Sequence, residues 1–200
     1  MKAETGMELL NQKIFLLLNC SNVCSGTWRD HLAIFTAEWL VWALPLLLTY
    51  MWLSGNFKMK RAAVFAASSA LVALGIGGVI GWLWPQPRPF TLPLGHLLIN
   101  HTADASLPSD HLTLWWGITL GLAYSPPTRR IGLILAVVGL APAWARIFVG
   151  VHFPADMLAA FVVSLGSAHI VSTYGRTLMT KAAVMGIKAQ RALVRRYSPG

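Results

Sequence analysis

Runs of apolar residues separated by short polar stretches make up most of the chain from residue 31 onwards. A helix needs about 20 such residues to cross the hydrocarbon core of a bilayer. Four runs reach or approach that length, at residues 31–53, 61–84, 131–148 and 154–174. A fifth run, residues 111–124, is short, and it spans only if the protein or the interface accommodates its polar start and neighbouring helices shield its end. The pattern predicts five transmembrane helices.

The two ends of the chain follow a different pattern. Residues 8–19, "ELLNQKIFLLLN", are too few to span, so we expect an interfacial amphipathic helix, with a tilted or re-entrant element as the alternative. Residues 175–200 are basic, and form either a helix on the inner leaflet or a solvated, frayed terminus. The predicted organisation is an all-α polytopic membrane domain at 1–174 and a tail at 175–200.

The composition also indicates a membrane protein. Hydrophobic residues make up 56% of the 200 residues and charged residues 12%, whereas soluble domains carry about 25% charged residues. The formal net charge of +9 raises the question of nucleic-acid binding. However, the basic residues are dispersed over short loops and the tail and form no continuous basic face. We therefore expect membrane lipids, and no nucleic acid, among the partners.

The placement of Lys and Arg predicts the orientation of the chain. In a five-span arrangement, eleven of the sixteen basic residues lie on one side, namely Lys58, Lys60, Arg61, Arg129, Arg130, Arg176, Lys181, Lys188, Arg191, Arg195 and Arg196. The positive-inside rule makes that side cytoplasmic, together with the C-terminus. Residues 85–110 and 149–156 then open on the outer face. We expect no cleaved signal peptide, with the first span acting as the insertion signal.

The seven acidic residues are few enough to consider singly. Glu38 lies within the first predicted span, where an ionisable side chain usually faces the bundle interior or a wet cavity and marks a functional site. The alternative is that Glu38 snorkels to the interface. Asp104, Asp110 and Asp156 all fall in the two outer segments. These segments therefore hold the candidate chemistry.

The segment "ARIFVGVHFPADM", residues 145–157, places His152 and Asp156 four residues apart. Pro154 suits the first turn of a helix, so we expect the fifth span to begin there. His152 then lies at its entry and Asp156 one turn further on the same side. A carboxylate held against one imidazole nitrogen fixes the tautomer and leaves the other nitrogen free as a nucleophile or base.

The segment "SLPSDH", residues 106–111, is also typical of a helix start, with Ser106 or Ser109 as the cap and Pro108 in the first turn. Two helix N-termini would then point free N–H groups into one outer pocket, which favours an anion. Arg88 and Arg146 lie at the outer ends of the second and fourth spans. Because one guanidinium group can donate to two phosphate oxygens at once, the pocket suits a phosphoryl group.

These residue types suit phosphoryl transfer through a histidine, with His111 available as general acid. Taken singly, each also has a structural explanation: the arginines as interface anchors, the histidines as helix caps and Asp156 as a first-turn charge. A metal-binding or transport protein is a further class, although the two arginines would repel a cation. Its ligands would come from His101, Asp104, Asp110, His111 and His152.

Three motifs in order resemble those of a known family. They are "RP" at Arg88, "PSDH" at residues 108–111 and "AR-x5-H-x3-D" from Ala145 to Asp156. They resemble the signatures K-x6-RP, PSGH and SR-x5-H-x3-D of the type 2 phosphatidic acid phosphatase family. "HTADASLPSDH" and "GVHFPADM" are further similar to bacterial undecaprenyl-diphosphate phosphatases associated with bacitracin resistance. The similarity extends from the first span through the fifth.

The resemblance implies a role for each matching residue. His152 would form a phosphohistidine, Asp156 would orient it, and His111 would protonate the leaving group and later activate water. The phosphate-binding residues would be Arg88, Arg146, Ser109, Pro108 and Asp110. We expect accessory residues at the pocket edge, namely Glu38, His101 and Asp104. The family generally needs no metal for catalysis, and the resemblance implies no other cofactor.

Two positions depart from the family pattern. Gly81 stands where the first motif has Lys, and Ala145 stands where the third has Ser. The first change removes a phosphate-binding cation and the second a hydroxyl group, so we expect reduced turnover. A catalytically silent member that binds lipid diphosphate is therefore an alternative.

The resemblance implies an enzyme of the bacterial cytoplasmic membrane that hydrolyses undecaprenyl diphosphate at the outer face and so recycles the carrier lipid of cell-wall synthesis. A phosphatidylglycerophosphate or phosphatidic acid phosphatase, or a lipid phosphotransferase of the same fold, is the alternative. The sequence does not indicate the oligomeric state.

Two further expectations concern residues away from the motifs. An i, i+4 pair on a helix is usually unbridged, so free thiols are favoured for Cys20 and Cys24 over a disulfide. Trp84, Trp115 and Trp116 are expected to line the membrane interface.

Overall fold

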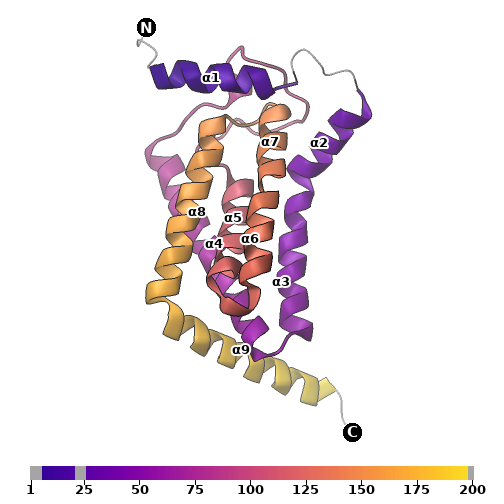
Figure 1. Ribbon diagram of the computed structural model, residues 1–200, viewed down its shortest axis with the longest axis vertical. Helices are drawn as coiled ribbons and strands as arrows, with labels where there is room; N and C mark the ends of the chain where they lie inside the picture. Colours follow the sequence, from indigo (N-terminus) through magenta and orange to yellow (C-terminus); the bar gives the residue numbers. More distant parts are fainter. Residues whose placement is uncertain (1–5, 21–25, 198–200) are drawn as a thin grey trace.

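The computed structural model describes residues 6–20 and 26–197, whose regular structure is entirely helical (Figure 1). The elements are α1 (Gly6–Leu18), α2 (Trp28–Glu38), η1 (Leu40–Trp42), α3 (Ala43–Ser54), α4 (Phe57–Leu83), η2 (Pro89–Thr91), α5 (Asp110–Tyr124), η3 (Pro126–Thr128), α6 (Arg129–Val138), α7 (Leu140–Phe148), α8 (Pro154–Tyr174) and α9 (Arg176–Tyr197), where η marks a short 3-10 helix. The all-α prediction is confirmed for this part of the chain.

Four helical stretches in the described residues are long and apolar enough to cross a membrane, at Trp28–Ser54, Phe57–Leu83, Pro126–Phe148 and Pro154–Tyr174. They correspond to the four long apolar runs of the sequence. Helix α5, with 15 residues, is shorter than these stretches. A fifth crossing by α5 therefore stays a prediction.

Helix α5 lies at the centre of the bundle, between α4, α6 and α8 (Figure 1). Most of its side chains are buried. A Cβ added at Gly117 would lie 2.6 Å from Cα of Ala70, and one at Gly121 would lie 2.7 Å from Cα of Ala66. Small residues thus let the backbones of α4 and α5 approach closely, as in helix pairs within membranes. The neighbours shield α5, as its short length requires.

Trp115 and Trp116 correct one expectation. Both side chains are buried on α5 and do not line the interface. Their indole N–H groups donate hydrogen bonds to the carbonyls of Leu135 and Ala136, at 2.8 and 3.0 Å. They reach α6 just before its junction with α7 at Gly139, where an added Cβ would lie 2.7 Å from the Trp115 ring. These tryptophans hold α5 against the broken fourth span, and Trp84 alone of the three is exposed.

The two terminal helices cross opposite ends of the bundle (Figure 1). Helix α1 lies over the ends of α7 and α8, where buried Phe15 makes an edge contact with Phe153 at a ring distance of 5.2 Å. Helix α9 packs against α4 and α8 at the other end. It begins directly after Gly175, near the predicted boundary between membrane domain and tail. That division, and the interfacial position of α1, stay predictions.

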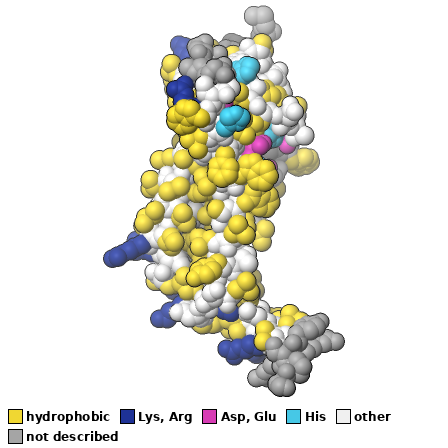
Figure 2. Space-filling view, turned by 90° about the vertical axis from the view of Figure 1, so that its right-hand side faces the viewer, with side chains coloured by type: hydrophobic (Ala, Val, Ile, Leu, Met, Phe, Trp, Pro, Cys, Tyr) yellow, Lys and Arg dark blue, Asp and Glu magenta, His cyan; other side chains and the backbone are white. Residues whose placement is uncertain are grey.

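Apolar and charged side chains occupy different parts of the surface. Figure 2 shows apolar side chains over the middle of one face, with charged side chains gathered toward the two ends.

Cys20 is buried and disulfide-bonded, which corrects the preference for free thiols. The reason is local: α1 ends at Leu18, so Cys20 is not part of a helix. Cys24 lies outside the described residues.

Candidate active site

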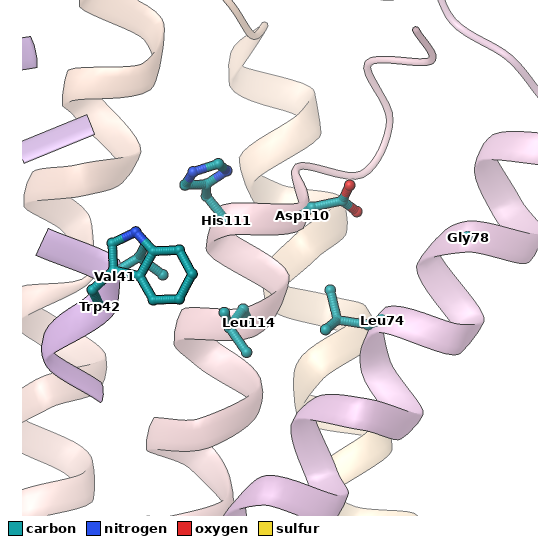
Figure 3. A pocket seen from close by; sticks show the side chains of 7 residues that line it. All are labelled: Val41, Trp42, Leu74, Gly78, Asp110, His111 and Leu114. Carbon is teal, nitrogen blue, oxygen red and sulfur yellow. The ribbon is translucent and has the colours of Figure 1, made fainter. Parts of the chain in front are cut away.

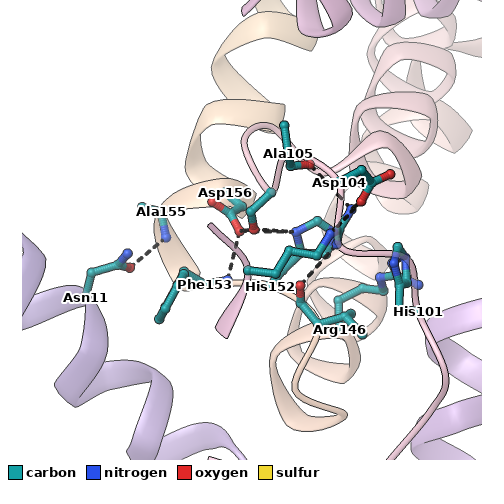
Figure 4. Close-up of polar contacts among 12 residues, drawn as sticks. Asn11, His101, Asp104, Ala105, Arg146, His152, Phe153, Ala155 and Asp156 are labelled. Carbon is teal, nitrogen blue, oxygen red and sulfur yellow. Dashed lines mark hydrogen bonds and ion pairs between the residues drawn. The ribbon is translucent and has the colours of Figure 1, made fainter. Parts of the chain in front are cut away.

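His152 and Asp156 form a buried pair at the start of α8 (Figure 4). Pro154 is the first residue of that helix, as predicted, and one turn of helix brings the two side chains together. His152 Nδ1 lies 3.1 Å from Asp156 Oδ2. The same oxygen accepts a hydrogen bond of 2.8 Å from the backbone N–H of Phe153. The carboxylate is therefore fixed by the helix terminus as well as by the imidazole.

Arg88 fixes the tautomer of His152. Its Nη1 atom lies 3.1 Å from His152 Nε2 and 3.1 Å from the carbonyl oxygen of Val151. Because a guanidinium group only donates, Nε2 must be the acceptor. The imidazole proton then resides on Nδ1 and faces Asp156. Burial, reinforced by the charges of Arg146 and Arg88, lowers the pKa of His152 well below its usual value, which keeps the ring neutral.

Ser106 belongs to the same cluster, although the sequence indicated it only as a helix cap. Its side chain is fully buried, donates a hydrogen bond to Asp156 Oδ2 and lies 3.3 Å from His152 Nδ1. Its backbone N–H is held by the carbonyl of Gln86 at 2.9 Å. The only sequence signal was its place in "SLPSDH", since the 50 residues between Ser106 and Asp156 hide the contact.

Arg88 is held by Asp104 from the loop between α4 and α5. Arg88 Nε lies 2.7 Å from Asp104 Oδ1, and Nη2 makes an ion pair with the same oxygen at 2.7 Å. Burial opposes ionisation of Asp104, but the hydrogen bond and charge of Arg88 outweigh it and lower the pKa of that carboxyl. Asp104 is 59% exposed while Arg88 is buried. Asp104, which was predicted to be an accessory residue, therefore holds Arg88, which was predicted to bind phosphate, from the solvent side.

Arg146 is almost completely buried near the end of α7 (Figure 4). Its Nη2 atom lies 3.1 Å from His101 Nε2, and Nη1 reaches the carbonyl of Ala37 at 3.5 Å. Its Nε atom has no hydrogen-bond partner among the described residues. Glu38 lies near enough to interact electrostatically with Arg146. The first span thus contributes to the site at its α2 end, as the position of Glu38 indicated.

His101 lies between Arg146 and His152. It accepts from Arg146 through Nε2, and its Nδ1 atom lies 3.1 Å from the carbonyl of Thr102. Burial is the main cause that lowers the pKa of His101, and the charges of Arg88 and Arg146 add to it. Its ring centre lies 6.4 Å from that of His152. His101 is therefore part of the same polar cluster as Arg146 and His152.

The "PSDH" motif is arranged differently from the prediction. Pro108 precedes α5 and does not lie in its first turn, because the helix begins at Asp110 with Ser109 as N-cap. Pro108 instead packs against α4, where a Cβ at Gly77 would meet its ring at 3.1 Å. The fully buried Ser109 hydroxyl makes no cap hydrogen bond, and no partner for it occurs in the described part of the chain. Ser109 is thus available to a ligand.

His111 and Asp110 face a largely apolar cavity of about 460 Å³ beside the cluster (Figure 3). The other lining residues come from the first span, α4 and α5, and are Val41, Trp42, Leu74, Gly78 and Leu114. His111 is half-buried, lies near His152 and is close enough to Arg146 to interact with its charge. His111, the second predicted catalytic histidine, therefore lines the same cavity as this group of apolar side chains.

Gly81 and Ala145, the two departures from the family pattern, both lie close to residues of the site. A Cβ at Gly81 would lie 3.4 Å from the carbonyl of Leu107 and 3.5 Å from Cβ of Ala105, beside the loop that carries Ser106. Ala145 is buried next to Arg146. No group of three or more His, Cys, Asp or Glu side chains placed to hold a metal ion occurs within residues 6–20 and 26–197.

The chain is similar in sequence to proteins of known description. The chain is 35% identical over 160 residues to a putative undecaprenyl-diphosphatase YbjG of Escherichia coli, covering 80% of this chain and 79% of the relative. It is 35% identical over 136 residues to undecaprenyl-diphosphatase BcrC of Bacillus subtilis, covering 68% of this chain and 69% of that one.

A solved structure shows the same fold. The crystal structure of Aquifex aeolicus LpxE matches with a TM-score of 0.64 at 22% identity, over 82% of this chain and 96% of that one. A family model described as the PAP2 superfamily matches residues 62–179, which include all three motifs. The resemblance predicted from those motifs is confirmed, and the chain belongs to the PAP2 superfamily.

Proposed function

We propose that this protein is an integral-membrane phosphatase that hydrolyses undecaprenyl diphosphate to undecaprenyl phosphate and inorganic phosphate. The observation that carries the proposal is the state of His152: Nδ1 faces Asp156, and the Nε2 lone pair faces Arg88. A neutral imidazole oriented in this way is a prepared nucleophile. Two relatives at 35% identity are described as undecaprenyl-diphosphatases, one of them as putative.

In the first step, His152 Nε2 attacks the terminal phosphorus and the bond from that phosphorus to the bridging oxygen breaks. Before this attack, the bound substrate takes over the Arg88 contact: the guanidinium group, which lies within hydrogen-bond distance of Nε2, turns to a phosphate oxygen and frees the Nε2 lone pair. Asp156 and Ser106 stabilise the positive charge that the imidazole gains. The products are a phosphohistidine and undecaprenyl phosphate.

In this mechanism His111 gives a proton to the bridging oxygen as it leaves, and later accepts a proton from the water that attacks the phosphohistidine. The second step releases inorganic phosphate and restores neutral His152. Arg146 Nε and Ser109 Oγ, buried without partners in the described residues, are the groups we assign to the remaining phosphate oxygens. Backbone N–H groups at the α5 N-terminus and Asp110 complete the pocket.

The cavity of Figure 3 supports a lipid diphosphate as the substrate. Val41, Trp42, Leu74 and Leu114 make one wall of it apolar, while His111 and Asp110 lie at its polar end. A polyprenyl chain suits the apolar wall and a diphosphate suits the polar end. The enzyme would lie in a bacterial cytoplasmic membrane with this pocket on the outer face and α9 on the cytoplasmic face, because the basic loops and tail lie at the other end.

The test is phosphate release from undecaprenyl diphosphate by the purified protein in detergent with EDTA present. We expect release by the wild type and none by His152→Ala. Phosphatidylglycerophosphate and phosphatidic acid, assayed in parallel, rank the substrates. Release that depends on added metal would overturn the metal-free mechanism. Absence of release from all three lipids, with diphosphate still bound, would identify a silent lipid-binding member.

A further inference from the structure

A polar cavity lies at the opposite end of the bundle from His152. It has a volume of about 230 Å³ and is lined by residues of α4, α8, α9 and the α5–η3 turn, which are Arg61, Phe65, Tyr124, Ser125, Pro126, Ser172, Arg176 and Thr180. Helix α8 runs along the bundle (Figure 1) from Pro154, two residues after His152, to Tyr174, two residues after Ser172 of the cavity. At 1.5 Å per residue, its 21 residues separate the two sites by about 30 Å. The cavity is therefore no part of the catalytic pocket.

The charge of this cavity is uncompensated. Arg61 and Arg176 both line it, and the ion pairs within the described residues are Arg88–Asp104 and His152–Asp156, at the other end. The chain has no acidic residue between 39 and 103 or between 157 and 200. Two guanidinium groups thus share one concave site without a carboxylate, and an anionic ligand would offset their repulsion.

The other lining groups suit a phosphate. Tyr124 and Ser125 supply hydroxyl groups, which are able to donate to phosphate oxygens. The hydroxyl hydrogens of Ser172 and Thr180 are already used, since each donates to a carbonyl of its own helix at 2.8 Å. The donors directed at a ligand therefore come from three elements: α4, the α5–η3 turn and α9.

We propose that this cavity binds the phosphate group of an anionic membrane lipid. Phe65 and Pro126 give it an apolar margin, and Tyr124 is 41% exposed on the bundle surface. The cavity lies where α4 begins and α8 ends, at the level expected for lipid headgroups. A bound phosphate bridges Arg61 of the bundle to Arg176 of α9 and so fixes the tail helix. The proposal does not depend on the catalytic chemistry.

The experiment measures lipid binding by the full chain in neutral detergent. The melting temperature is followed while dioleoyl phosphatidylglycerol, dioleoyl phosphatidylcholine or inorganic phosphate is added, and each titration midpoint gives an apparent affinity. Arg61→Lys with Arg176→Lys keeps the charge but removes the paired guanidinium contacts. Lys181→Gln with Lys188→Gln removes two charges from α9 at exposed positions that do not line the cavity.

We expect phosphatidylglycerol, and not phosphatidylcholine, to stabilise the wild type. The double Arg→Lys variant should bind it about tenfold more weakly, which corresponds to losing one charge-assisted contact, while the double Lys→Gln variant stays within about twofold. The same pattern with inorganic phosphate would support the site with a soluble ligand as its source. Wild-type affinity in the Arg→Lys variant, or equal losses in both variants, would overturn the proposal. Comparing midpoints keeps the test valid if a variant melts earlier without lipid.

Discussion

Arg88 Nη1 donates a hydrogen bond to His152 Nε2 across 3.1 Å, so a cation faces the nitrogen that the proposed mechanism uses as nucleophile. Burial is the main reason that His152 stays neutral, and the charges of Arg146 and Arg88 add to it. The Arg88 contact also directs the Nε2 lone pair toward the place where a phosphate would bind in the proposed mechanism. The same guanidinium group is held from behind by Asp104. The residue that we propose to bind the phosphate is therefore also the one that selects the tautomer of His152.

The first prediction concerns His152. The variant His152→Ala should lower phosphate release by at least about 10³-fold, because no other group replaces the nucleophile. Rapid quenching of the wild type with substrate labelled at the terminal phosphate should trap an acid-labile phosphohistidine that the variant lacks. His169→Ala, an exposed position on the same helix, is the control and should keep normal turnover. Turnover by His152→Ala near the wild-type rate would remove this residue from the mechanism.

A second prediction concerns Ser106 as a positioning residue. Loss of a hydrogen bond to a charged group costs about 1.5–3 kcal/mol, so Ser106→Ala should lower kcat about 10- to 100-fold with little change in KM. The pH below which activity declines should also move upward, because without this donor the Asp156 carboxylate acts more strongly on His152 and favours its protonated form. Ser167→Ala is a matched control, since Ser167 is a buried serine of α8 that bonds its own helix at Val163. Equal effects of the two changes on Tm, with kcat unaffected, would make Ser106 purely structural.

The contrast between Asp156 and Ser106 shows how far the sequence alone could lead. His152 and Asp156 are four residues apart on one helix start, so local geometry sufficed to predict their contact. Ser106 reaches the same carboxylate from 50 residues away, and the Arg88–Asp104 pair depends on the path of a loop. Long apolar runs likewise revealed four spans, whereas the buried role of Trp115 required knowing which helices surround α5.

A third prediction follows from His101 and His152, whose pKa values are both lowered in the folded protein. Below about pH 6.5 the unfolded chain binds more protons at these positions than the folded chain does. The free energy of unfolding should therefore decrease as the pH is lowered. Tm measured from pH 7.5 to pH 5 should therefore decline. Besides each other, the two rings face Arg88, Arg146, Asp104, Asp156 and Ser106.

His101→Asn removes one of these titrating groups while keeping an acceptor for Arg146. Its decline in Tm between pH 6.5 and pH 5 should be shallower than that of the wild type. For His152, the proposed nucleophile, the acid limb of kcat/KM that reports the free enzyme should lie below pH 6.5, because its lowered pKa keeps the ring neutral there. Parallel Tm slopes in both proteins would contradict the assignment to His101.

The last prediction concerns Glu38 and the buried Arg146. Arg146 reaches the carbonyl of Ala37, and the carboxylate of the next residue interacts with its charge. Because Glu38 is half-buried, its charge is only partly screened. Glu38→Gln should therefore lower the free energy of unfolding by about 1–2 kcal/mol and reduce turnover, while Glu38→Asp retains most of both. Thermal unfolding and phosphate release check the pair. Unchanged Tm and turnover in Glu38→Gln would mean that Glu38 is an interfacial residue and that Arg146 is held by its hydrogen bonds alone.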